Sequence, residues 1–140
     1  MRYSKATGYA LHTTVHIMLQ PEGSSVGVQE LAEMQHLSPT YLSKILTKLT
    51  KAGLIHSTPG AKGGYKIARL KHEISFLDVI NAIEGNNSLF DCSIHHEGCL
   101  IENVMREAED HMRNELSLKL LIDIAKEAEA RHINDKGMQQ

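Results

Sequence analysis

The 140-residue sequence predicts a mainly α-helical fold with one small β-hairpin and a long helical region at its C-terminal end. Apolar residues recur three and four positions apart along most of the chain, which is the spacing of one helix face. A single glycine-rich turn separates two short segments that resemble strands. Apolar residues make up 41% of the chain and aromatic residues only 4%, so aliphatic helix packing is favoured over an all-β sandwich.

The first helix is expected over residues 4–20, with Leu11, Val15 and Met18 on its inner face. Pro21 and the glycine and serines that follow it interrupt the helical pattern. A second, short helix is expected over residues 28–34. The two helices therefore follow each other closely, as in a small helical domain.

The third helix carries the clearest signals. Ser38 is a favoured N-cap residue, and Pro39 is tolerated at the first helical position. Gly53 is expected to end the helix. Its apolar stripe consists of Leu42, Ile45, Leu46 and Leu49. The other side carries lysines, hydroxyl residues and a tyrosine without an acidic residue: Thr40, Tyr41, Ser43, Lys44, Thr47, Lys48 and Lys51.

A β-hairpin is expected next, with strands over residues 54–58 and 65–69. Four glycine or proline residues and Lys62 occupy the turn between them. The tip of this hairpin is therefore basic.

A fourth helix is expected to begin after Ser75, because Ser75 and Asp78 have the spacing of a capping box. Leu77, Ile80 and Ile83 are expected to face inward. A polar loop over residues 86–99 follows, and from Leu100 the chain is expected to be helical again, with Ser117 capping a second segment.

The long C-terminal helix is amphipathic but has little partner surface within so short a chain. Its apolar stripe contains Ile101, Val104, Met105, Ala108 and Met112. We therefore expect it to pair with a second copy of the chain, which makes the protein a homodimer.

The order of these elements predicts a winged helix-turn-helix in residues 1–72. Residues 73–140 would hold a linker helix, the cysteine loop (86–99) and the dimerisation helices. The charge is divided in a similar way: residues 1–71 carry nine Lys and Arg and three Glu, whereas residues 72–140 carry six Lys and Arg and fourteen Asp and Glu. A basic half of this kind favours nucleic-acid binding.

In a helix-turn-helix the second helix of the pair enters the major groove, and dimers bind two half-sites about one helical turn apart. We therefore expect double-stranded operator DNA as the partner. The predicted contacts come from the N-terminal arm, the third helix and the hairpin: Arg2, Tyr3, Lys5, Ser38, Thr40, Tyr41, Ser43, Lys44, Thr47, Lys48, Lys62, Gly63 and Tyr65.

Four stretches of the sequence resemble the Rrf2 (Rrf-two) family of bacterial regulators. They are residues 38–49 (SPTYLSKILTKL), 52–55 (AGLI), 60–65 (GAKGGY) and 74–85 (ISFLDVINAIEG), and the resemblance extends over about residues 2–125. It implies a homodimeric transcriptional regulator, with repression as the expected mode. The family's target genes serve iron–sulfur, nitrosative, redox or cysteine metabolism.

Relatives that bind an iron–sulfur cluster carry three cysteines in the loop before the long helix. Cys92 matches the first of these and Cys99 the last, but the chain contains only two cysteines. The fourth ligand in relatives is a histidine, or an acidic residue near the N-terminus of the partner subunit. This sequence has no acidic residue before Glu22.

Three interpretations of the cysteine loop stay open. Cys92, His95, His96 and Cys99 offer thiolate and imidazole ligands, which suit zinc or an iron–sulfur centre. The two thiols can alternatively act as a redox switch. In the third interpretation the loop senses nothing, and either a small molecule regulates the protein or the protein has lost its sensor.

Other classes of function fit less well. A winged helix whose basic face binds an acidic protein is the main alternative to a DNA-binding regulator. No phosphate-binding loop or ordered catalytic group accompanies the cysteines and histidines, so we expect no enzyme. No signal peptide or membrane-spanning segment is recognisable, which predicts a cytoplasmic protein.

Overall fold

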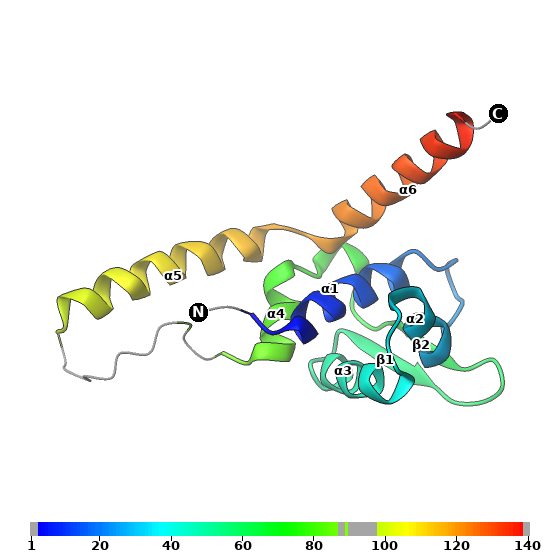
Figure 1. Ribbon diagram of the computed structural model, residues 1–140, viewed down its shortest axis with the longest axis horizontal. Helices are drawn as coiled ribbons and strands as arrows, with labels where there is room; N and C mark the ends of the chain where they lie inside the picture. Colours follow the sequence, from blue (N-terminus) through cyan, green and yellow to red (C-terminus); the bar gives the residue numbers. More distant parts are fainter. Residues whose placement is uncertain (1–2, 87–88, 90–97, 139–140) are drawn as a thin grey trace.

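The computed structural model describes residues 3–86, 89 and 98–138 (Figure 1). Helix α1 (Lys5–Met18) runs through the N-terminal body, with α2 (Val28–Gln35), α3 (Pro39–Lys51) and α4 (Phe76–Glu84) around it. Helices α5 (Leu100–Leu118) and α6 (Leu121–Met138) extend along one side of this body and project beyond it. No helix among the described residues is long and apolar enough to cross a membrane.

The buried face of α1 differs from the predicted one. Met18 is buried, but Leu11 and Val15 are only half-buried at the edge of the core. The helix instead turns Thr13 and Thr14 inward, and the Thr14 hydroxyl donates to the Ala10 carbonyl at 2.8 Å. Threonines with hydrogen-bonded hydroxyls can be buried without leaving an unpaired group, so counting only apolar residues misplaced this face.

The helix-turn-helix forms as predicted. Between α2 and α3, His36 adopts the left-handed conformation with φ 57°. Ser38 is the N-cap of α3, and its hydroxyl accepts from the Tyr41 amide at 3.1 Å. The four residues of the predicted stripe are all buried: Leu42, Ile45, Leu46 and Leu49.

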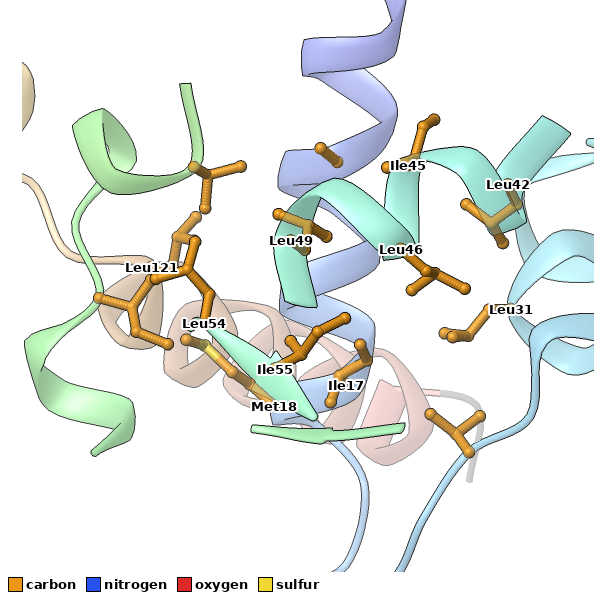
Figure 2. Close-up of a cluster of buried hydrophobic side chains, with 14 of the residues drawn as sticks. Ile17, Met18, Leu31, Leu42, Ile45, Leu46, Leu49, Leu54, Ile55 and Leu121 are labelled. Atoms are coloured by element: carbon orange, nitrogen blue, oxygen red, sulfur yellow. The ribbon is translucent and has the colours of Figure 1, made fainter. Parts of the chain in front are cut away.

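Figure 2 shows how this stripe meets side chains from several elements. Leu31 of α2, Ile17 and Met18 of α1, and Ile55 all lie in the same cluster as the α3 leucines. Leu121, at the start of α6, joins them from much later in the sequence. The core therefore holds α3 firmly by its inner side and leaves its outer side free.

The hairpin consists of β1 (Ile55–Thr58) and β2 (Gly64–Ile67), paired antiparallel from Ile55 opposite Ile67 to Thr58 opposite Gly64. We call β1, β2 and the turn between them the wing. Val26 bridges to Tyr65 and holds the wing against the body. A side chain at Gly64 would place its Cβ 2.6 Å from the Val26 backbone, so this approach requires glycine.

A short 3-10 helix, η1 (Lys71–Glu73), leads into α4. The predicted capping box is present: Ser75 Oγ accepts from the Asp78 amide at 3.1 Å, and the Asp78 carboxylate accepts from the Ser75 amide at 2.9 Å. Ile80 and Ile83 are buried as expected, but the third buried position is Val79, while Leu77 is only half-buried.

The break between α5 and α6 lies at Lys119 and Leu120. The Lys119 carbonyl accepts from the Phe76 amide at 2.9 Å, and the Leu121 amide donates to the Ile74 carbonyl at 3.0 Å. Ser117 is thus not the expected cap. It belongs to the last turn of α5, where its hydroxyl donates to the Asn114 carbonyl at 2.6 Å.

Candidate DNA-binding interface

The outer side of α3 is a continuous polar and basic surface. Every predicted contact residue of this helix is exposed: Thr40, Tyr41, Ser43, Lys44, Thr47 and Lys48. Lys51 continues this surface at the C-terminal end of the helix. The helix itself contains no Asp or Glu. Three ammonium groups and several hydroxyls thus face solvent without a counter-charge on their own helix.

Three of the predicted contact residues in or next to α3 have side chains with intramolecular partners. The Ser38 hydroxyl caps α3, and the Thr47 hydroxyl donates to the Ser43 carbonyl at 2.9 Å. The Tyr41 ring packs edge-on against Tyr9, with 6.0 Å between the ring centroids. Ser38 therefore positions the helix, and Tyr9 of α1 holds Tyr41 in place.

A shallow hollow of about 470 Å³ lies on this same surface. Thr40, Ser43, Lys44 and Thr47 line one side of it, and Val28 at the start of α2 lines the other. The hollow places hydroxyls and an ammonium around a concave patch at the N-terminal part of α3. Helix-turn-helix proteins contact base edges with this part of the second helix.

The predicted contact residues of the wing differ in exposure. Lys62 is exposed in the turn, next to Gly63. Tyr65, which was predicted to contact DNA, lies in strand β2 opposite Ser57: its amide donates to the Val26 carbonyl at 2.8 Å, and its side chain packs against the core. The structure thus gives Tyr65 a role in attaching the wing.

The three predicted contact residues of the N-terminal arm differ in their surroundings. Arg2 lies outside the described residues, and Lys5 is exposed at the start of α1. The Tyr3 hydroxyl is buried and has no hydrogen-bond partner among the described residues. Burial is the main cause that raises the pKa of Tyr3; the charge of Arg113 lowers this pKa and the charge of Glu109 raises it. Arg113 and Glu109 both belong to α5. Tyr3 therefore points towards α5 and offers no exposed hydroxyl to a phosphate.

Sequence reasoning missed Glu84, which joins the start of α1 to the end of α4. One carboxylate oxygen accepts from the Ser4 amide at 2.6 Å, the Ser4 hydroxyl at 2.8 Å and the Thr7 hydroxyl at 2.6 Å. The hydrogen bond from Thr7 lowers the pKa of Glu84 most, and Ser4 and the charge of Lys48 also lower it, whereas burial opposes them. No local sequence signal links residues 77 positions or more apart.

The cysteine loop is described only in part. Cys92, His95 and His96 lie outside the described residues. Cys99 is a free, half-buried thiol that directly precedes α5, and it makes no side-chain cap. The Leu89 amide donates to a carboxylate oxygen of Glu109 at 2.8 Å, which ties the loop to α5.

The described residues do not by themselves fit a metal centre. No group of three or more His, Cys, Asp or Glu side chains close enough to share a metal ion occurs among them. The whole sequence supplies two thiols, one fewer than the three of the cluster-binding relatives.

Comparison with known proteins identifies the fold and the family. Residues 3–127 match the Rrf2 family, described as an iron-dependent transcriptional regulator. YffB of Lactococcus lactis, named as an HTH-type transcriptional regulator, is 30% identical over 140 residues, covering 92% of this chain and 90% of the relative.

Two solved structures agree with this match. CymR, the global cysteine regulator of Bacillus subtilis, superposes with a TM-score of 0.77 at 25% identity, over 90% of this chain and 97% of that one. The oxidised form of Staphylococcus aureus CymR gives a TM-score of 0.75 at 30% identity, over 89% and 96% of the two chains. The predicted winged helix-turn-helix is confirmed, and the chain belongs to the Rrf2 family of winged-helix transcriptional regulators.

Proposed function

We propose that this regulator is a cytoplasmic homodimer that binds a two-half-site operator through α3 and the tip of the wing. The observation that carries the proposal is the outer side of α3, which is exposed and contains no acidic residue. Lysines on such a surface neutralise phosphates, and hydroxyl groups reach base edges or phosphate oxygens. Repression is the mode that we propose, and binding rather than catalysis is the activity.

The contacts divide by their positions. Thr40, Ser43 and Lys44 surround the hollow at the N-terminal part of α3 and are proposed to meet base edges and adjoining phosphates. Thr47 and Lys48 lie further along the helix, where we propose phosphate contacts, and Lys62 would reach the backbone from the wing. Ser38 and Tyr65 support these contacts by positioning α3 and the wing.

The homodimer is proposed from α5. No residue of this helix is buried within its own chain, and Leu100, Ile101 and Val104 are between 65% and 80% exposed. Three large apolar side chains within five positions form a patch that a second copy of the same helix can cover.

DNA binding by α3 is tested by fluorescence anisotropy with DNA from upstream of the gene, over a series of salt concentrations. Lys44→Ala is expected to weaken binding, and the slope of log affinity against log salt should fall by roughly one, because one phosphate contact is lost. Lys126→Ala removes an exposed lysine of α6 and serves as the matched control.

Equal effects of the two substitutions would contradict a specific role for α3. Failure of the unmodified protein to prefer its upstream DNA over scrambled DNA, in both oxidised and reduced form, would favour the alternative that the basic face binds a protein.

We propose that the cysteine loop is the sensor and acts through Cys92 and Cys99. Either the loop binds a metal or cluster, or its two thiols form a redox switch, and one experiment distinguishes these two possibilities. Protein purified without oxygen and analysed for iron, sulfide and zinc identifies a metal or cluster, with His95 and His96 as further ligands. Absence of metal together with two titratable thiols, lost on mild oxidation, supports a thiol switch. Retention of both thiols would instead direct attention to a small molecule.

A further inference from the structure

A cavity of about 380 Å³ lies on the N-terminal body, away from the outer side of α3. It is lined by the C-terminal part of α1, the turn that follows it, the end of strand β2, η1 and the residues just before η1. Small-molecule sites in proteins commonly have volumes of roughly 300–1,000 Å³. The cavity is therefore large enough for a small organic ligand.

The charges that line the cavity are mainly positive. Lys66, Arg69 and Lys71 contribute cationic groups, and Glu22 is the one acidic residue among the lining residues. His72 adds a further polar side chain. An anionic ligand is favoured over a cation or a neutral molecule by this arrangement.

Two of the cations are fixed in place by the fold. Arg69 forms an ion pair with Asp78 at 3.3 Å, and the Lys71 ammonium donates to the Met18 carbonyl at 3.1 Å. Lys71 retains further N–H donors, because an ammonium group has three. The Lys66 ammonium has no ion-pair or hydrogen-bond partner among the described residues, and it is free to bind a ligand.

Apolar side chains line another part of the cavity, and Gln20 and Ser24 add uncharged polar groups to it. Ile17 is buried beneath the cavity, Ile67 is half-buried, and Leu70 is 60% exposed. An exposed leucine next to three cations gains from contact with a hydrocarbon chain. The combination thus matches a ligand with one anionic group and a short aliphatic part.

We propose that this cavity binds a small aliphatic carboxylate, with Lys66 as the principal partner of the carboxylate and Leu70 in contact with the chain. The cavity lies between the base of the wing and η1, and η1 packs against α6. From this position the ligand would affect operator affinity, and that effect rests on the proposed DNA binding. Binding of the carboxylate to the cavity does not depend on the proposed DNA binding.

The test is an NMR titration of the ¹⁵N-labelled protein without DNA, at constant ionic strength. Hexanoate is the probe, and hexanamide is its neutral analogue. Saturable shifts are expected at the amides of Ile17, Ile67 and Leu70 with hexanoate, and hexanamide should bind roughly tenfold more weakly, because it cannot form charge-assisted hydrogen bonds.

Variants assign the site. Lys66→Gln is expected to weaken hexanoate binding roughly tenfold, Lys66→Arg to preserve it, and Leu70→Ala to weaken it less. Lys126→Gln makes the same charge change on α6 and should leave binding unchanged. Equal binding of hexanoate and hexanamide, no binding of either, or an unaffected Lys66→Gln variant would overturn the proposal.

The experiment also separates this site from the DNA interface. Loss of operator affinity in Lys66→Gln together with no hexanoate binding would make the cavity part of the DNA contact surface and refute the carboxylate site. Hexanoate binding to a protein that fails to bind any operator would leave the site intact and refute the proposed function.

Discussion

Glu84 illustrates how one side chain connects regions that are remote in the sequence. It accepts three hydrogen bonds from Ser4 and Thr7 at the start of α1, and the charge of Lys48 on α3 acts on it as well. The carboxylate at the end of α4 therefore fixes the N-terminal end of α1 and is electrostatically coupled to Lys48 of α3.

Glu84→Gln is expected to lower the free energy of unfolding by about 1 kcal/mol at pH 7, because the glutamine oxygen still accepts hydrogen bonds but carries no charge. The folded-state pKa of Glu84 lies below its unfolded value. This stabilisation is therefore complete above the unfolded pKa, near roughly pH 4.3, and is lost as the pH falls through the folded pKa.

Urea unfolding at pH 7 and at pH 3 measures the effect, and the difference between variant and unmodified protein should shrink at the lower pH. Glu129→Gln, at an exposed position on α6, is the control and should change little at either pH. A difference for Glu84→Gln that is independent of pH would contradict the charge-based explanation.

At the scale of the elements, local signals were sufficient wherever the interaction itself is local. The Ser38 cap, the buried stripe of α3 and the Ser75 capping box were all predicted, and each involves residues within one or two helical turns. The outer side of α3 followed from the same stripe. The positions of most candidate DNA contacts could therefore be obtained without a structure.

Where the prediction was wrong, contacts between residues far apart in the sequence determine the structure. The end of α5 is set by backbone pairing of Lys119 and Leu121 with the chain near Ser75, so a search for a local cap selected Ser117 instead. The buried face of α1 depends partly on Thr13, whose hydroxyl accepts from the Gln35 side chain at 2.6 Å. Neither partner is near in the sequence.

Ser75→Ala tests the capping box as a unit of α4. The substitution removes the hydroxyl that accepts from the Asp78 amide, and it is expected to cost about 1 kcal/mol of stability. Urea unfolding provides the measurement. Ser57→Ala, at an exposed position of strand β1, should have almost no effect, and a comparable loss in both variants would contradict a specific contribution of the cap.

At the scale of the whole molecule, basic and acidic residues lie in different halves of the chain. The basic half, residues 1–71, contains α3 and the wing, and the acidic half contains α5 and α6. In Figure 1, α5 and α6 extend away from the body that carries α3. If α3 and the wing bind DNA as proposed, repulsion between phosphates and the acidic helices would favour approach by the basic body.

The exposed apolar side chains of α5 are the basis of the proposed homodimer, which is tested at this scale. Val104→Glu is expected to convert the homodimer to a monomer, because it places a charge among Leu100 and Ile101, which would be buried only in the dimer. Val104 is 65% exposed in the single chain, so the substitution should not impair folding.

Analytical ultracentrifugation distinguishes the two states: the unmodified protein should have twice the 15.6 kDa chain mass, and the variant should have that mass once. Asn103→Glu adds the same charge at an exposed position off the apolar stripe and should remain dimeric. The monomeric variant should also bind a two-half-site operator much more weakly, because the second half-site no longer benefits from the linkage to the first. A monomeric unmodified protein would contradict the proposed homodimer, whereas a dimer that persists in Val104→Glu would place the interface away from this part of α5.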